Sequence, residues 1–299
     1  MPGGRMFSTR LKVVLGVVAA LGVGGVGWYG VERLQHQSSS FDLWKTFSGK
    51  AHGGRRAQVG PVNLYYETYG AGPPVLVLHG GAASLESMHY QIVDLARDHL
   101  VVAPDSRGHG RSTDVAGPMH YADMAQDMIG LMDQLHIAKA DIVGWSDGGN
   151  IGLDMAMKHP ERVGRLVTIG ANFDAAGLVN PNSPASPDNE EFADGKDIYR
   201  TLSETPDNWP VLYHQVTEMW RTEPHYTTDQ LGRIRSPVMV IAGEHDAIRR
   251  SHTDALAHAI PGAQEKIFPH AGHMVLMTEP EAVDGAIRAF LASHPDRKP

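Results

Sequence analysis

The sequence contains no cysteine among its 299 residues. This absence excludes disulfide bonds, a thiol nucleophile and a lipid-modified cysteine, although it leaves the redox compartment open. The chain also lacks an internal repeat, an acidic tail and a long basic patch, and its net charge is -8. Nucleic acid is therefore not an expected partner.

Metal-binding patterns are missing as well. The chain has 17 histidines, but none lies in a His-Glu-x-x-His pattern, and no cysteine is present as a second type of ligand. We therefore expect neither a metal nor a cofactor. With 42% hydrophobic and 20% charged residues, the chain suits one large α/β domain with a full core.

Residues 144–148, with the sequence Gly-Trp-Ser-Asp-Gly, are the most informative segment. They place Ser146 between two glycines, after an apolar run and before a helical pattern. Such a strand, sharp turn and helix are typical of a nucleophile elbow, which holds a serine hydroxyl above the edge of a sheet. Glycine-rich turns match the same short pattern, so other segments have to support this interpretation.

A serine nucleophile needs a histidine as its base and an acid that fixes the tautomer of that histidine. Along chains with this elbow, the order is serine, acid, histidine. Asp246 follows an apolar strand predicted at 238–242, and His273 follows a strand predicted at 265–268. The sequence therefore predicts a catalytic triad of Ser146, Asp246 and His273.

Other residues could fill two of these roles. Glu244 and Asp174 also follow predicted strands and are alternative acids, and His270 is an alternative base. His273 is favoured over His270 because it follows a glycine that lets the loop turn toward the serine, whereas His270 directly follows a proline.

Hydrogen-bond donors are also needed for the oxyanion that forms when a serine attacks a carbonyl. An apolar run at 76–78 ends in His79-Gly80-Gly81, ahead of a predicted helix. We predict that the backbone N–H groups of Gly81 and Asp147 form the oxyanion hole, with His79 as a structural residue of the turn. The Asp147 carboxylate either points into the pocket, where it would favour amines over anions, or orders the elbow.

Together these segments resemble the serine hydrolases of the α/β-hydrolase fold superfamily, from about residue 58 to the C-terminus. Residues 105–112 strengthen the resemblance, because they match an Asp-x-Arg-Gly-x-Gly-x-Ser turn that many members carry. The resemblance implies a mostly parallel central sheet with helices on both faces and a helical lid between late strands. More loosely, residues 144–149 are similar to those of biphenyl-hydrolase-like esterases and enol-lactone hydrolases.

The resemblance also implies a reaction. Members similar to dehalogenases and epoxide hydrolases carry aspartate where this chain has Ser146, so the serine implies an acyl-enzyme. We expect a serine hydrolase that cleaves a small carboxylic ester or lactone. A carbon–carbon hydrolase or a perhydrolase would use the same triad, and a binding or receptor protein with little turnover could keep the fold.

Short apolar segments alternate with helical patterns along the domain, which favours a covered, mostly parallel sheet with its chemistry at the carboxyl ends of the strands. Strands are predicted at 64–68, 75–78, 101–104, 141–143, 166–169, 238–242 and 265–268, and helices at 85–96, 121–135, 150–158, 253–259 and 281–292.

About 65 residues separate the strands predicted at 166–169 and 238–242, which is too long for a simple crossover. Helical patterns at 190–202 and 210–221 predict a lid inserted at about 175–235. Large side chains of this lid, together with one of the elbow, are candidates to line an apolar pocket over the serine, although each could instead only pack the lid onto the core. These candidates are Trp145, Tyr199, Trp209, Tyr213, Met219 and Trp220.

The N-terminal part is predicted to be separate from this domain. Arg5, Arg10 and Lys12 precede an uncharged run at 13–29, which is at the short limit of a membrane span. We predict a membrane anchor or a secretory signal at 1–34, a linker at 35–57 and the α/β-hydrolase domain at 58–299. An anchor would give membrane contact, and either segment would put the domain outside the cytoplasm, in the periplasm of a Gram-negative bacterium.

Overall fold

The computed structural model describes residues 40–180, 186–188 and 192–293. The chain divides into two compact units, residues 1–42 and 43–299, and the whole sheet belongs to the second. The anchor or signal predicted at 1–34 lies outside the described residues. None of the helices within the described ranges combines the length and the apolar character that a membrane crossing requires.

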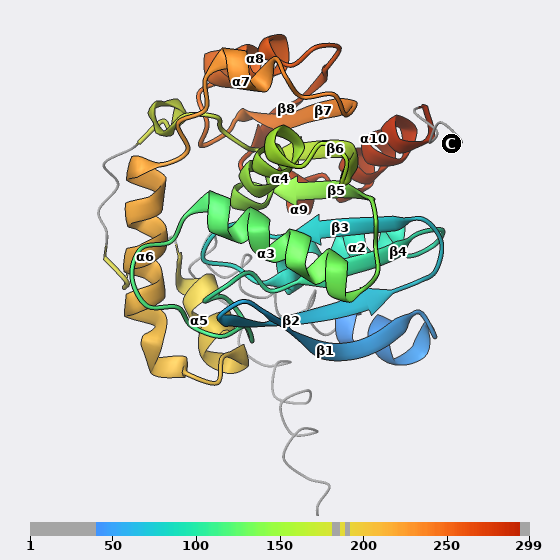
Figure 1. Ribbon diagram of the computed structural model, residues 1–299, viewed down its shortest axis with the longest axis vertical. Helices are drawn as coiled ribbons and strands as arrows, with labels where there is room; N and C mark the ends of the chain where they lie inside the picture. The colour runs from blue at the N-terminus through green and yellow to red at the C-terminus, as the bar shows by residue number, and fades with distance from the viewer. Residues whose placement is uncertain (1–39, 181–185, 189–191, 294–299) are drawn as a thin grey trace, which may run out of the picture. The chain divides into compact units, whose positions relative to one another are not determined.

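An eight-stranded sheet forms the centre of the second unit, in the order β1-β2-β4-β3-β5-β6-β7-β8 (Figure 1). The pairs β1–β2 and β2–β4 are antiparallel, and all other neighbours are parallel. The predicted α/β fold with a mostly parallel sheet is therefore confirmed. The strands are β1 (Ala51–Val59), β2 (Val62–Tyr69), β3 (Pro74–Leu78), β4 (Leu100–Pro104), β5 (Ala140–Trp145), β6 (Val163–Ile169), β7 (Val238–His245) and β8 (Gln264–Gly272).

Helices cover both faces of the sheet. Helices α2, α9 and α10 pack on one another behind the strands in Figure 1, and α3 and α4 lie in front of them. The helices outside the inserted region are α2 (His89–Leu95), α3 (Tyr121–Gln134), α4 (Asp147–Lys158), α8 (Arg250–Ala259), α9 (Val275–Thr278) and α10 (Pro280–Ser293), and a 3-10 turn at Leu85–Met88 precedes α2.

The central strands are buried because they have helices on both sides. Every residue of β5 is buried, and β3 and β6 each have only one partly exposed residue. Their sequences are correspondingly continuous apolar runs rather than alternating ones. Since β3 and β5 to β8 run parallel, their carboxyl ends meet at one edge of the sheet, where the segments predicted to carry the chemistry begin.

Regular structure begins within the segment predicted as a linker at 35–57. Residues 40–47 are helical, and β1 begins at Ala51 and pairs with β2 as far as Val59. This strand lies at the edge of the sheet, and most of its side chains are exposed. An exposed edge strand needs no alternation of apolar and polar residues, so no sequence pattern predicts it.

A helical insertion separates β6 from β7, as the length of this interval predicts. It contains α5 (Ala193–Leu202), α6 (Trp209–Thr222) and α7 (Thr228–Leu231). Helix α6 stands beside the carboxyl ends of the parallel strands in Figure 1. The insertion is therefore next to the edge of the sheet at which the predicted site residues lie.

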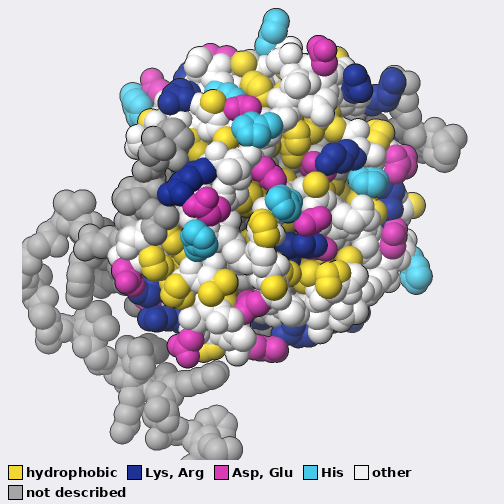
Figure 2. Space-filling view, turned by 60° about the vertical axis from the view of Figure 1, so that its left-hand side comes forward, with side chains coloured by type: hydrophobic (Ala, Val, Ile, Leu, Met, Phe, Trp, Pro, Cys, Tyr) yellow, Lys and Arg dark blue, Asp and Glu magenta, His cyan; other side chains and the backbone are white. Residues whose placement is uncertain are grey.

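The face of the molecule drawn in Figure 2 carries both positive and negative side chains, and neither sign dominates it. Basic, acidic and histidine side chains are interspersed there with hydrophobic ones. This mixed face offers no continuous basic track of the kind that follows a phosphate backbone.

Candidate active site

Ser146 lies at the sharp turn between β5 and α4 with φ of 53° and ψ of -116°. A positive φ is costly for a residue that has a side chain, so the surrounding structure must hold it. The Ser146 amide donates to the carbonyl of Ile169 at 2.7 Å, and the Ser146 carbonyl accepts from the amide of Gly149 at 2.8 Å. A side chain at Gly148 would lie closer than 3.0 Å to the backbone of Leu78, which explains the glycine there. The segment has the geometry of the predicted elbow.

His273 connects the serine to an acid. Its Nε2 lies 3.0 Å from Ser146 Oγ, and its Nδ1 lies 2.7 Å from Asp246 Oδ1. An ionised carboxylate can only accept hydrogen bonds, so Nδ1 carries the proton and Nε2 is left to accept from the serine hydroxyl. Ser146 is partly exposed whereas Trp145 and Asp147 are buried, so the hydroxyl is the accessible group of the elbow.

Asp246 is held as a carboxylate. Burial alone would raise its pKa, but the hydrogen bond from His273 and those from the amides of Ile248 and Gly243 outweigh burial and keep the pKa below its usual value. The side chain therefore stays ionised at neutral pH and fixes the orientation of the imidazole.

The alternative acids and the alternative base have other partners. Asp174 accepts from the amide of Ala176 and pairs with His225 at 2.9 Å. Glu244 accepts from the amide of His270 at 2.8 Å, and the His270 side chain is 91% exposed. The structure thus brings Ser146, Asp246 and His273 together, as the chain order predicts, and not the alternatives.

Gly170 is a site residue that sequence reasoning missed. It follows β6 with φ of +61°, and a Cβ atom there would lie 2.9 Å from the His273 ring and 3.3 Å from Asp246 Oδ2. Only a glycine leaves room for the imidazole and the carboxylate to meet. The available signal was a glycine directly after an apolar strand, at the edge where the other site residues lie.

Two buried histidines fix the loop that carries Gly81. His79 Nε2 accepts from the amide of Ser106 at 2.9 Å, and His109 Nε2 accepts from the amide of Ala82 at 3.0 Å. Burial lowers the pKa of His79 to about 4 and that of His109 to about 3, so both rings are neutral and can accept. The expected role of His79 as a structural residue of the turn agrees with these contacts.

The two predicted oxyanion donors lie close to each other. A Cβ atom at Gly81 would lie closer than 3.0 Å to the carboxylate of Asp147 and 2.7 Å from Cζ2 of Trp220. Among the described residues, no protein atom accepts a hydrogen bond from the backbone N–H of Gly81 or of Asp147. Their role as oxyanion donors remains a prediction, and neither N–H group has a protein acceptor within the described part of the chain that would compete with it.

The Asp147 carboxylate connects the elbow to the insertion. It accepts from Tyr121 Oη of α3 at 2.7 Å and from Trp220 Nε1 of α6 at 2.9 and 3.1 Å. Burial raises its pKa to about 6, against the lowering effect of these two donors and of His273. Of the two roles considered for this carboxylate, its contacts match the ordering of the elbow.

The candidate pocket residues fall into two groups. Trp145 donates from Nε1 to the carbonyl of His273 at 3.0 Å, and Trp220 contacts the elbow through Asp147. The remaining candidates are buried within the insertion, and their polar atoms have partners in neighbouring loops. The rings of Tyr199, Trp209 and Tyr213 pack one after another in tilted contacts, with centroids 5.8 and 5.7 Å apart. Tyr199 Oη donates to Asp114, Trp209 Nε1 donates to the carbonyl of Pro187, and Met219 is 2% exposed.

Comparison with known proteins agrees with the fold. A family model of the alpha/beta hydrolase fold matches residues 73–201. The 2-hydroxymuconate semialdehyde hydrolase of Pseudomonas sp. strain CF600 is 36% identical over 249 residues, an alignment that covers 75% of this chain and 88% of that protein.

Solved structures give the same result at lower identity. The enol-lactonase from Burkholderia xenovorans LB400 is 22% identical with a TM-score of 0.65, and the match covers 80% of this chain and all of that one. A meta-cleavage product hydrolase from Pseudomonas fluorescens IP01 is also 22% identical, with a TM-score of 0.64 and coverage of 81% and 98%. These two similarities concern the fold alone.

Proposed function

Since the chain belongs to the α/β-hydrolase fold family and is a hydrolase, we propose that it cleaves a carboxylic ester or a lactone through an acyl-enzyme on Ser146. One observation carries the proposal: Ser146 Oγ lies 3.0 Å from His273 Nε2, and His273 Nδ1 lies 2.7 Å from the ionised Asp246. This is the arrangement that a serine needs to become a nucleophile at neutral pH.

The reaction begins when Ser146 Oγ attacks the carbonyl carbon and His273 Nε2 takes the hydroxyl proton. The backbone N–H groups of Gly81 and Asp147 bind the negative oxygen of the tetrahedral intermediate. Collapse of this intermediate breaks the bond to the leaving oxygen, which receives the proton from His273. The product of this half-reaction is an ester of Ser146.

Water completes the cycle. His273 removes a proton from a water molecule that attacks the acyl carbon, and the same proton returns to Ser146 Oγ as the acid leaves. Asp246 holds the imidazole in place and stabilises its positive charge in both halves. Trp220, through its contact with Asp147, holds α6 close to Gly81 and the elbow.

The triad geometry serves several classes of acyl substrate, so the choice among them draws on the similar proteins. The fold that the chain shares with an enol-lactonase is compatible with a lactone as one substrate class. The 36% identity to a hydrolase named for 2-hydroxymuconate semialdehyde supports carbon–carbon hydrolysis on the same triad as the second candidate.

A substrate panel tests the proposal. Wild type and Ser146→Ala are compared on p-nitrophenyl esters of graded chain length, several lactones and a meta-cleavage product. We expect ester or lactone turnover by wild type and a loss of about 10⁴- to 10⁶-fold in Ser146→Ala. Turnover of the meta-cleavage product alone would select the second candidate. Undiminished ester hydrolysis by the variant would refute both.

A further inference from the structure

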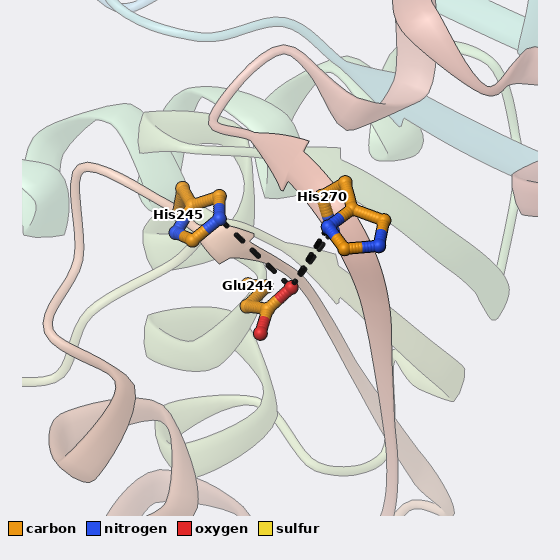
Figure 3. Close-up of side chains that lie close together, drawn as sticks. All are labelled: Glu244, His245 and His270. Carbon is orange, nitrogen blue, oxygen red and sulfur yellow. Dashed lines mark hydrogen bonds and ion pairs between the residues drawn. The ribbon is translucent and has the colours of Figure 1, made fainter.

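Three side chains that commonly bind metals meet at an exposed corner of the sheet, outside the candidate triad. Glu244 and His245 end β7, and His270 belongs to the neighbouring β8. One ligand atom from each lies within 4.8 Å of the other two. Figure 3 shows both imidazoles directed toward the same carboxylate oxygen, with Glu244 Oε2 3.9 Å from His245 Nε2 and 3.7 Å from His270 Nδ1.

An irregularity in the strand pairing creates this cluster. β7 and β8 pair at Gly243 with Phe268 and next at His245 with Gly272, so β8 carries extra residues between these two pairs. His270 lies in this bulge with φ of 62°, and its amide donates to Glu244 Oε2 at 2.8 Å. The bulge thus turns His270 out of the strand and across to the end of β7.

From this geometry we propose that Glu244, His245 and His270 form a binding site for a divalent transition metal ion, with Zn²⁺ as the best match. Two imidazole nitrogens and one carboxylate oxygen are a ligand set that Zn²⁺ accepts, with water in the fourth position. Tetrahedral ligands at about 2.0–2.1 Å from zinc are roughly 3.4 Å apart. To reach this spacing, each imidazole nitrogen would have to move about 0.5 Å or less toward the Glu244 oxygen. The two imidazole nitrogens would have to approach each other by about 1.4 Å or less. Rotation about the χ angles of these exposed side chains permits both movements.

The Glu244 carboxylate has room for a cation beside its existing hydrogen bond. Its Oε2 accepts from the amide of His270 at 2.8 Å. A carboxylate has about four lone-pair positions, so an oxygen that accepts from an amide can still bind a metal. Arg250, the nearby positive charge, is itself paired with Asp254.

Occupancy would brace the catalytic edge of the sheet. His245 directly precedes Asp246, and His270 lies near the end of β8, three residues before His273. An ion held by both strand ends would fix the spacing of the segments that carry the acid and the base, while leaving both of these residues free. The site is therefore a structural brace and not a catalytic metal centre.

The test is a zinc titration of the full chain, without a histidine tag and after treatment with EDTA, in competition with a chromophoric chelator. We expect one equivalent of tight binding in wild type. Binding should weaken at least about tenfold in His270→Ala, His245→Ala and Glu244→Gln, since loss of even an outer partner of a metal ligand costs this much. Zinc should also raise the Tm of wild type and not that of His270→Ala.

Two control variants are needed. The first tests whether zinc binds to other exposed histidines, and the second tests whether zinc binding depends on the proposed nucleophile. His225→Ala removes an exposed histidine that pairs with a single carboxylate, Asp174, and should keep the wild-type zinc affinity. Ser146→Ala should keep it as well, because the serine is no ligand. Equal zinc affinity of wild type and His270→Ala, or an equal loss in His225→Ala, would overturn the proposal whatever the outcome for hydrolysis.

Discussion

Replacing Trp220 with phenylalanine removes an N–H group that donates to both oxygens of the buried Asp147 carboxylate, at 2.9 and 3.1 Å. Asp147 is 4% exposed, so water cannot replace the lost donor. A hydrogen bond to a charged group is worth about 1.5–3 kcal/mol. We therefore expect Trp220→Phe to lower the free energy of unfolding by about 2 kcal/mol when Asp147 is ionised.

The size of this loss should depend on pH. The pKa of Asp147 in the folded protein, about 6, is raised from its ordinary value of 3.8, so the folded state binds this proton more tightly than the unfolded state. The contribution of this group to stability therefore falls as pH rises from about 4 to 6 and is constant above that range. Loss of the Trp220 donor raises the folded pKa further, so the fall continues beyond pH 6 in the variant. At pH 5 the Asp147 carboxyl is mostly neutral, so loss of the hydrogen bond from Trp220 should cost only about 1 kcal/mol of stability.

A second tryptophan of α6 provides the matched control. Trp209 Nε1 donates to the carbonyl of Pro187 at 2.8 Å, an acceptor that does not titrate. Trp209→Phe should therefore lose the same stability at pH 5 and pH 8. Urea unfolding of wild type and both variants at these two pH values measures the free energies of unfolding. Because each variant is compared with wild type at the same pH, the contributions of the other titrating groups cancel. Equal, pH-independent losses in Trp220→Phe and Trp209→Phe would refute the reasoning.

Further predictions concern the triad and the oxyanion hole. Asp246→Asn should lower kcat for an ester by about 10³- to 10⁴-fold, because the imidazole loses its orienting charge. Asp174→Asn should leave kcat unchanged, and the reverse pattern would move the acid to Asp174. Gly81→Ala should lower kcat by about 10²-fold, because its Cβ atom would displace the Asp147 carboxylate and the Trp220 ring and so shift the proposed oxyanion donors. Gly285→Ala, in α10 with only a contact of 3.9 Å, is the control and should keep wild-type kcat.

The sequence was informative wherever a pattern is local. The central parallel strands are continuous apolar runs because both faces of the sheet are covered, and Ser146 and Asp246 each follow such a run, whereas His273 follows the largely exposed β8. The order of these residues along the chain predicts that they lie close together, because parallel strands end at one edge of the sheet.

Other contacts between distant segments could not be predicted. Nothing in the sequence pairs Trp220 with Asp147, because the contact depends on how α6 passes the elbow. The meeting of His270 with Glu244 depends on a bulge in β8 that leaves no regular pattern. β1 was missed for a different reason, since an exposed edge strand is not constrained to alternate apolar and polar residues.

Labelling with a fluorophosphonate tests the central claim most directly, because the probe reacts only with a serine that has been made nucleophilic. The account predicts that peptide mass spectrometry finds the phosphonyl group on Ser146, that Asp246→Asn slows the labelling, and that Ser146→Ala is not labelled. Hydrolysis that persists while Ser146 remains unmodified, or a label on another residue, would contradict it.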